Sequence, residues 1–235
     1  MSGHGSGMQE LTPELLLRAY AVGIFPMAES RDDSGVFWVD PQDRGILPLE
    51  TFHVPRRLKK MIRGGAFEVR CDSAFADVLK LCGEARGDRP ETWINAAIED
   101  AVLGLFDLGF AHSVEVRRDG KLVGGLYGIA LGGAFFGESM FSRFRDASKV
   151  ALVHLVARLR MGGFTLLDVQ FITDHLRQFG ASEIPARRYL EHLNEALKVQ
   201  GVFPADGPAG GDVSGPGAVE DALEALFRQS STQTS

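Results

Sequence analysis

One short segment, residues 164–170 with the sequence FTLLDVQ, most constrains what this chain can fold into. Its apolar and β-branched residues predict a buried strand, and the two-residue period of a strand puts Phe164, Leu166, Asp168 and Gln170 on one face. An acid and an amide then share a face that is otherwise apolar. Because burying such groups without partners costs roughly 1–3 kcal/mol each, the segment predicts either a functional site or a polar pair that fixes the strand register.

The composition is that of an ordinary soluble globular protein. The chain has 235 residues, of which 45% are hydrophobic and 24% charged, enough for one domain or two small ones. It has no run of about eighteen apolar residues and no secretory leader, so we expect a cytoplasmic protein without a membrane partner. The two cysteines and six histidines lack the spacing of metal ligands, so no metal is predicted.

Shifts in composition divide the chain into four parts. We expect a flexible Gly/Ser-rich leader at 1–10 and a small N-terminal domain at 11–65, which opens with a helix capped by Thr12. The main domain spans 66–203. Residues 204–235 are of low complexity and are expected to be disordered apart from a weak helix around 219–228.

The main domain has the signals of an antiparallel meander followed by a crossover. Residues 113–117 alternate like a strand, Asp119 and Gly120 are a strong hairpin signal, and residues 121–130 form the return strand. A third strand runs through Met140, and a helix at 147–161 crosses to the strand that carries Asp168. The last globular element is expected to be a helix at 186–200.

This order predicts an α+β fold whose C-terminal domain resembles that of the GCN5-related N-acetyltransferases. Such enzymes that use acetyl-CoA hold its pyrophosphate with a Gly-rich loop between the third strand and the crossover helix. Here that loop is SRFRDASK, and Asp146 and Ser148 stand where glycines would let backbone N–H groups approach phosphate. Coenzyme A is therefore not expected.

Several uncommon motifs occur together: AYAVGIFP, WVDPQDRGILPLETFHVPRRLKK, HSVEV, LVGGLYGIALGGAFFGESMFSR, DASKVAL, LLDVQ and GASEIPARRYL. From about Leu11 to Leu197 the chain thus resembles the bacterial leucyl/phenylalanyl-tRNA-protein transferases. The resemblance implies transfer of leucine or phenylalanine, less readily methionine, from its tRNA to an N-terminal Arg or Lys of a protein. The acceptor would then be degraded through the N-degron route. Leu-tRNA or Phe-tRNA would be a co-substrate, and no cofactor is expected.

The resemblance also implies roles for the polar residues. Asp168 and Gln170 match the family's catalytic pair: the Gln170 carbonyl oxygen would hydrogen-bond the attacking amine, and Asp168 would orient and polarise Gln170. Glu138, in the GES motif, would lie beside the reactive centre and hold the acceptor's α-ammonium or basic side chain. An ion pair between Glu138 and Arg143 or Lys149 is the alternative. Thr173 departs from the Asn of some members and would alter hydrogen bonding around Gln170.

A second group of residues is expected to bind the aminoacyl-adenosine end of the donor. The two tryptophans would stack on adenosine, and the others would form an apolar pocket for the leucyl or phenylalanyl side chain. Each of them could instead pack in the core. The predicted residues are Trp38, Trp93, Leu126, Phe135, Ser139, Met140 and Phe141.

A basic segment has no acid between Glu50 and Glu68, although the net charge of the chain is −6. It is either a solvated helix face or a contact for the tRNA backbone, and the resemblance favours tRNA. Its residues are Arg56, Arg57, Lys59, Lys60 and Arg63. An acyl-CoA-dependent N-acyltransferase and a noncatalytic tRNA-binding protein remain as alternative functions. His175, near the site, is expected to be structural or a neighbour of the site.

Overall fold

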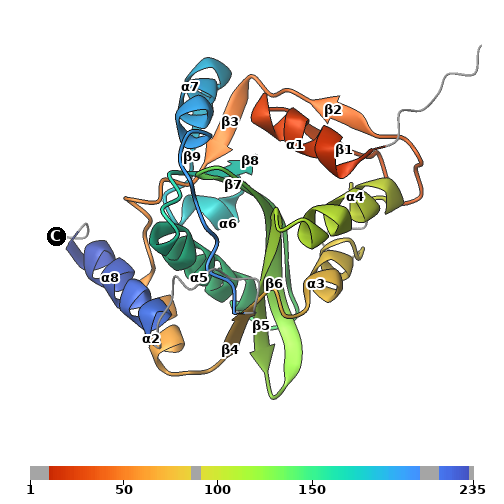
Figure 1. The fold of residues 1–235 in the computed structure, drawn as a ribbon. Helices are drawn as coiled ribbons and strands as arrows, with labels where there is room; N and C mark the ends of the chain where they lie inside the picture. The colour runs from red at the N-terminus through yellow and green to blue at the C-terminus, as the bar shows by residue number, and fades with distance from the viewer. Residues whose placement is uncertain (1–10, 86–90, 207–216, 233–235) are drawn as a thin grey trace, which may run out of the picture.

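The computed structural model describes residues 11–85, 91–206 and 217–232, and a seven-stranded sheet forms its centre (Figure 1). The strand order is β4-β5-β6-β7-β8-β3-β9, and all neighbours are antiparallel except β7 and β8. The strands are β3 (Asp43–Ile46), β4 (Glu68–Cys71), β5 (Ala111–Arg118), β6 (Lys121–Leu131), β7 (Ala134–Ser142), β8 (Leu166–Gln170) and β9 (Ser182–Pro185).

Helices cover both faces of this sheet and give it two hydrophobic cores. Figure 1 shows α5 with α2 and α8 on one side, and α3 and α4 on the other. The helices are α1 (Pro13–Ala21), α2 (Arg56–Arg63), α3 (Phe75–Cys82), α4 (Ala96–Asp107), α5 (Ala147–Met161), α6 (Asp174–Arg177), α7 (Ala186–Ala196) and α8 (Ala218–Thr232). None of the helices in these ranges is long and apolar enough to cross a membrane.

The structure confirms the meander and the crossover. Strands β5, β6 and β7 are consecutive antiparallel neighbours, and Asp119 and Gly120, with φ values of 50° and 72°, form the hairpin turn between the first two. Helix α5 has the predicted bounds and leads into β8, parallel to β7. The architecture is a mixed α/β one, with a sheet covered by helices and a small N-terminal part.

The strand carrying Asp168 is shorter than predicted. It begins at Leu166, after a turn in which Gly163 has a φ of 74°. Phe164 precedes the strand and packs in the core on the α5 side, whereas Leu166 packs in the core on the opposite side. The prediction that these two residues share a face was therefore wrong, because the period of a strand does not extend through a turn.

The N-terminal part is shared between two sheets. Strands β1 (Phe25–Met27) and β2 (Phe37–Val39) form a separate antiparallel pair next to α1, whose predicted cap is confirmed by Leu15 N donating to Thr12 Oγ1 at 3.2 Å. Strand β3 instead lies inside the main sheet between β8 and β9. The 11–65 domain stays a prediction, and the leader at 1–10 lies outside the described residues.

Helix α8 is a packed part of the fold, so the last globular element is not the helix after Pro185. Its apolar residues Leu223, Leu226 and Phe227 are buried in the core that α5 covers. The expected weak helix thus exists, and its i, i+3, i+4 apolar spacing explains why it docks. Disorder was also wrong for residues 204–206, because Asp206 pairs with Arg158 of α5 at 2.7 Å. Residues 207–216 and 233–235 of the predicted tail lie outside the described residues.

We expect Leu226→Ala to lower the free energy of unfolding by about 2–5 kcal/mol, because the substitution leaves a cavity beneath a docked helix. Arg228→Ala, at an exposed position on the same helix, should change it by about 0.5 kcal/mol or less. Urea unfolding followed by circular dichroism measures both. Equal stabilities of the two variants would show that α8 is not part of the cooperative core.

Candidate active site

A pocket of about 520 Å³ opens where β7 and β8 separate. The two strands pair only where Ala134–Phe136 of β7 lie beside Leu166–Asp168 of β8. Beyond this point β7 continues to Ser142 without β8 beside it. The remaining walls come from β1, β6, the first half of α5 and the loop after β8. Most of the lining is apolar, and Glu138 and Gln170 are among its polar residues.

A β-bulge turns Glu138 into this pocket. In the β6–β7 register Tyr127 pairs with Ser139 and Gly128 with Gly137, so Glu138 is the extra residue between two ladder pairs. Bulges re-aim a side chain relative to the regular alternation of a strand. The GES motif is thus the place where the regular pleat of β7 is interrupted.

The Glu138 carboxylate is held by neutral groups. Tyr20 hydrogen-bonds it, and Gln170 Nε2 lies 3.4 Å from its Oε1. Burial raises the pKa of Glu138 to about 8, opposed by the Tyr20 hydrogen bond and reinforced by the nearby Asp168 carboxylate. No ion pair joins Glu138 to a cation within the described part of the chain.

The alternative partners predicted for Glu138 are engaged elsewhere. Arg143 pairs with Glu84 at 2.7 Å, and Lys149 pairs with Asp146 at 3.1 Å. A structural ion pair at Glu138 was therefore a wrong alternative. Its carboxylate remains available to a ligand in the pocket.

Asp168 is completely buried and forms an ion pair with Arg44. Arg44 Nε lies 3.0 Å from both carboxylate oxygens and Nη2 lies 2.6 Å from Oδ2, so the contact is bidentate. The Tyr189 hydroxyl donates to the same Oδ2 at 2.6 Å. Burial beside this carboxylate raises the pKa of Tyr189, so its hydroxyl stays protonated and acts as the hydrogen-bond donor.

Arg44 also connects three separate parts of the chain. Its Nη1 donates to the Gly23 carbonyl at 2.8 Å, and its guanidinium lies 4.6 Å from the ring centroids of Phe25 and Tyr189. The N-terminal segment, β8 and α7 are thus joined through one side chain. Phe25 in turn lines the pocket.

Gln170 has a strained backbone that turns its side chain toward Glu138. Its φ is 53°, in the left-handed region that a non-glycine residue rarely adopts. Its backbone N–H donates to Asp168 Oδ1 at 2.8 Å, which stabilises this conformation. Gly45 allows the turn, since a Cβ there would lie 3.1 Å from the Gln170 carbonyl oxygen.

Asp168 and Gln170 are in contact through the backbone of Gln170. Asp168 accepts from the Gln170 backbone rather than from its side-chain amide, because Arg44 and Tyr189 occupy the other directions around the carboxylate. The Gln170 side chain lines the pocket, whereas Asp168 does not. The expectation that both side chains point the same way was wrong, because the alternation ends at the left-handed residue.

Five of the seven residues predicted to bind aminoacyl-adenosine line the pocket: Trp93, Leu126, Ser139, Met140 and Phe141. Phe135 does not, because it is fully buried on the α5 side against Phe164 and Phe203. Trp38 does not either. It lies on β2 opposite Pro26 and is 40% exposed, one strand away from the pocket-lining residues of β1.

Several residues of the site were not predicted from the sequence. Phe25 and Met27 line the pocket from the IFPM segment, whose apolar character could have indicated a wall. Arg44, Tyr189 and Tyr20 carried no local signal, because each acts on a partner far away in the sequence.

The basic segment forms α2 as predicted, but its cations are not all exposed. Lys59 is buried, and its Nζ donates to the Phe227 carbonyl of α8 at 2.7 Å. Burial lowers the pKa of Lys59, and Arg63 pairs with Glu224 of the same helix at 2.6 Å. The prediction that Lys59 faces a nucleic acid was therefore wrong. Arg56, Arg57 and Lys60 remain exposed.

The remaining predicted neighbours of the site are His175 and Thr173, which both line the pocket. Burial lowers the pKa of His175, which favours the neutral imidazole. No cluster of three or more His, Cys, Asp or Glu residues that could hold a metal occurs in the described ranges.

Comparisons with known proteins agree on one family. The family described as leucyl/phenylalanyl-tRNA protein transferase matches residues 46–194, and its N-terminal domain matches residues 9–42. The chain is 64% identical over 190 residues to the leucyl/phenylalanyl-tRNA–protein transferase of Paramagnetospirillum magneticum, covering 81% of this chain and 91% of the relative. It is 58% identical over 210 residues to that of Phenylobacterium zucineum, covering 89% and 95%.

Among solved structures, L-PGS from Bacillus licheniformis superposes with a TM-score of 0.43 and 14% identity. The superposition covers 64% of this chain and 55% of that one.

We expect Arg44→Met to lower the free energy of unfolding by about 3–5 kcal/mol, because it leaves the Asp168 carboxylate buried without its cation. Arg70→Met removes an exposed pair with Glu68 that solvent screens, so its effect on the free energy of unfolding should be far smaller. Denaturant unfolding of both variants and of Arg44→Met/Asp168→Leu tests this. The double variant should lose less free energy of unfolding than Arg44→Met and Asp168→Leu lose together. Similar costs for Arg44→Met and Arg70→Met would contradict a buried, coupled pair.

Proposed function

The chain belongs to the leucyl/phenylalanyl-tRNA-protein transferase family, and we propose that its pocket transfers leucine or phenylalanine, less readily methionine, to an N-terminal Arg or Lys. Members of this family are aminoacyltransferases, which take an aminoacyl group from tRNA and add it to a protein. The new peptide bond would direct the acceptor to N-degron-dependent degradation. The enzyme would act in the cytoplasm on Leu-tRNA and Phe-tRNA and would need no cofactor.

The observation that carries this proposal is the meeting of Glu138 and Gln170 at 3.4 Å on the wall of an apolar pocket. The donor is an activated ester, and an α-amine with a pKa near about 7.7–8.0 is partly neutral at pH 7. The reaction therefore needs positioning and polar stabilisation more than a strong base. Two polar groups in an otherwise apolar site supply both.

Gln170 is the residue that we assign to the attacking amine. Its Nε2 faces Glu138, which leaves its carbonyl oxygen for an N–H of the amine. The left-handed backbone fixes this direction, and Asp168 stabilises that backbone through the Gln170 N–H. Asp168 is accordingly a positioning residue, since its own oxygens are occupied by Arg44, Tyr189 and this N–H.

Glu138 is the residue that we assign to the acceptor's positive charge. Its contacts, Tyr20 and Gln170, are neutral donors, so no protein cation neutralises the carboxylate directly within the described residues. An α-ammonium or a basic side chain entering the pocket would supply the missing charge. This requirement favours acceptors that begin with Arg or Lys.

The donor would occupy the apolar part of the pocket. Leu126, Met140 and Phe141 give a surface for a leucyl or phenylalanyl side chain, and Trp93 gives a ring on which adenosine can stack. The exposed cations of α2 would contact the tRNA backbone. The order of the meander, crossover helix and β8 supports a fold of the GCN5-related acyltransferase kind.

Gln170→Ala should reduce kcat/KM for leucine transfer by about 10²-fold, because it removes a hydrogen bond made in the transition state. The assay follows radiolabelled leucine from Leu-tRNA to a peptide that begins with Arg, with an Ala-initiated peptide beside it. Gln178→Ala, an exposed glutamine near the same loop, is the matched control. Unchanged activity of Gln170→Ala would exclude a role for Gln170 in the reaction. Equal labelling of both peptides would show that the enzyme does not select an N-terminal Arg.

The pH dependence of kcat/KM for the acceptor peptide tests Glu138. With a pKa of about 8, Glu138 is mostly protonated at pH 7 and must lose its proton, as must the acceptor amine. The slope of log kcat/KM against pH should therefore approach about 2 below pH 7 and about 1 in Glu138→Gln, where only the amine titrates. Identical slopes for the two enzymes would mean that Glu138 does not act as a carboxylate.

A further inference from the structure

The part of α2 that is exposed is small for a nucleic-acid contact. Helix α8 takes up Lys59 and Arg63, which leaves Arg56, Arg57 and Lys60 on the surface. A protein with a net charge of −6 needs a local concentration of cations to attract a polyanion. Other exposed cations next to α2 are therefore relevant.

The loop between β7 and α5 extends the basic surface of α2 to the pocket. Ser142 and Ser148, at the two ends of this loop, both line the pocket. Between them Arg145 has a 74% exposed side chain, and its Nε lies 3.8 Å from Asp146 Oδ2. Arg57 of α2 lies 3.8 Å from the same oxygen, so α2, the loop and the pocket are neighbours.

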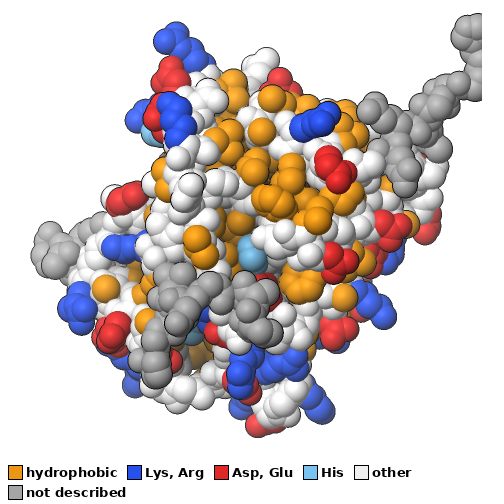
Figure 2. Space-filling view, viewed as in Figure 1, with side chains coloured by type: hydrophobic (Ala, Val, Ile, Leu, Met, Phe, Trp, Pro, Cys, Tyr) orange, Lys and Arg blue, Asp and Glu red, His pale blue; other side chains and the backbone are white. Residues whose placement is uncertain are grey.

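The tip of the β5–β6 hairpin continues this surface on the other side of the loop. The Arg118 guanidinium lies 4.3 Å from the ring centroid of Phe144, which is in the loop and 40% exposed. Lys121 is the register partner of Arg118, so the two side chains share a face. Figure 2 shows Lys and Arg side chains gathered at the lower end of the molecule, where Figure 1 places this hairpin.

We propose that this basic band, Arg56, Arg57, Lys60, Arg145, Arg118 and Lys121, binds the phosphate backbone of the donor tRNA beyond its aminoacylated end. The proposal rests on the proposed function, because it takes the donor in the pocket to be tRNA. The acids that contact the band are Asp146 and Asp119, and Lys121 pairs with no acid in the described residues. The loop joins the pocket to the band, so an RNA whose end lies in the pocket can continue onto the band. Contacts to phosphate would make the binding dependent on salt and independent of tRNA sequence.

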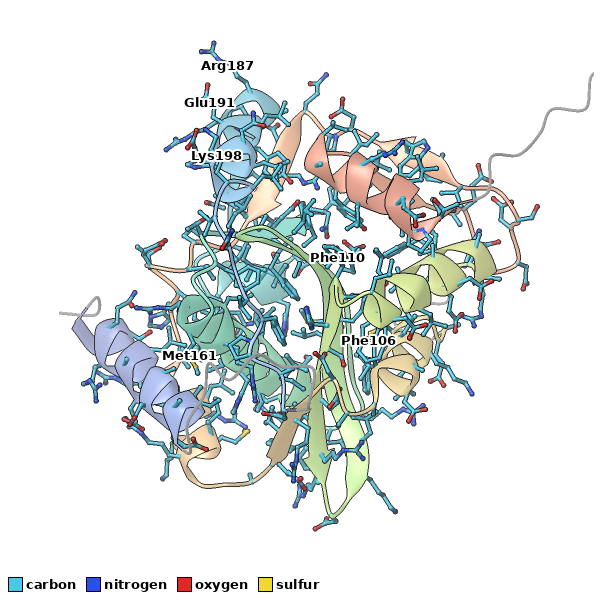
Figure 3. The ribbon with its side chains drawn as sticks, in the orientation of Figure 1. Phe106, Phe110, Met161, Arg187, Glu191 and Lys198 are labelled. Atoms are coloured by element: carbon cyan, nitrogen blue, oxygen red, sulfur yellow. The ribbon has the colours of Figure 1, made fainter. Side chains whose placement is uncertain are left out.

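The variant Arg118→Gln/Lys121→Gln tests the part of the band farthest from α2. The matched control is Arg187→Gln/Lys198→Gln, which removes the same charge from exposed positions on and just after α7, at the opposite end of the molecule (Figure 3). Equilibrium binding of uncharged tRNA is measured between 50 and 200 mM salt, as conditions of the assay. Leucine transfer is measured from full-length Leu-tRNA and from leucyl-adenosine, which has no phosphate backbone.

For the hairpin variant, the slope of log K against log salt should be shallower by about 1.4–1.8, because two phosphate contacts are lost and each contributes about 0.7–0.9. Its tRNA binding should weaken by about tenfold at low salt, with kcat/KM lowered for Leu-tRNA and unchanged for leucyl-adenosine. An unchanged slope, or the same loss in the α7 control, would overturn the proposal. Equal losses with both donors would also overturn it, since the hairpin would then act through the fold.

Two further outcomes separate this inference from its premise and from another partner. If the unsubstituted enzyme transfers leucine from neither donor, the proposed function fails, and the tRNA binding curves still decide whether the band binds RNA. Binding to vesicles with anionic lipids that is lost in the hairpin variant, with no loss of tRNA binding, would overturn the proposal in favour of a membrane surface.

Discussion

The buried pair of Arg44 and Asp168 is the interaction on which the site depends. Burying two charges is costly, and an ion pair offsets this cost only when its geometry is good and every remaining donor or acceptor direction is filled. Here two guanidinium nitrogens of Arg44 contact the Asp168 carboxylate, and the third donates to the Gly23 carbonyl. The Tyr189 hydroxyl and the Gln170 N–H donate the remaining hydrogen bonds to the carboxylate. A lysine could not replace this fork, since an ammonium is a single point charge.

Two local irregularities convert an ordinary sheet into a site once this pair is in place. The bulge in β7 turns Glu138 out of the regular alternation, and the left-handed Gln170 ends β8 with its side chain facing that carboxylate. Strained backbone persists only where surrounding contacts determine it, and the Asp168 acceptor is such a contact. The strain is therefore evidence that the direction of the Gln170 side chain matters.

The sequence was most informative where the signals are local. The hairpin at Asp119 and Gly120 and helix α5 follow from turn chemistry and periodicity, and the structure has both. The period of two placed Asp168 and Gln170 on β8 but not the directions of their side chains, because Gln170 has a left-handed backbone. Phe135 and Lys59 were misplaced because burial is decided by the elements that pack on them, and for Lys59 that element is α8. Arg44 could not be predicted, since its partner is 124 residues away and neither local segment requires it.

The distribution of charge follows from the same division between buried and exposed cations. Arg44 compensates Asp168 inside the protein, and the buried Lys59 donates to a carbonyl of α8, so these two cations stabilise the fold. Arg63 is exposed, but Glu224 of α8 neutralises it. The exposed cations next to the pocket then stand out against a chain that is acidic overall. In the proposed reaction, the exposed basic band would attract a polyanionic donor, and Glu138 would attract a basic acceptor once the carboxyl group has lost its proton. The two substrates would then be recognised by different parts of the same face.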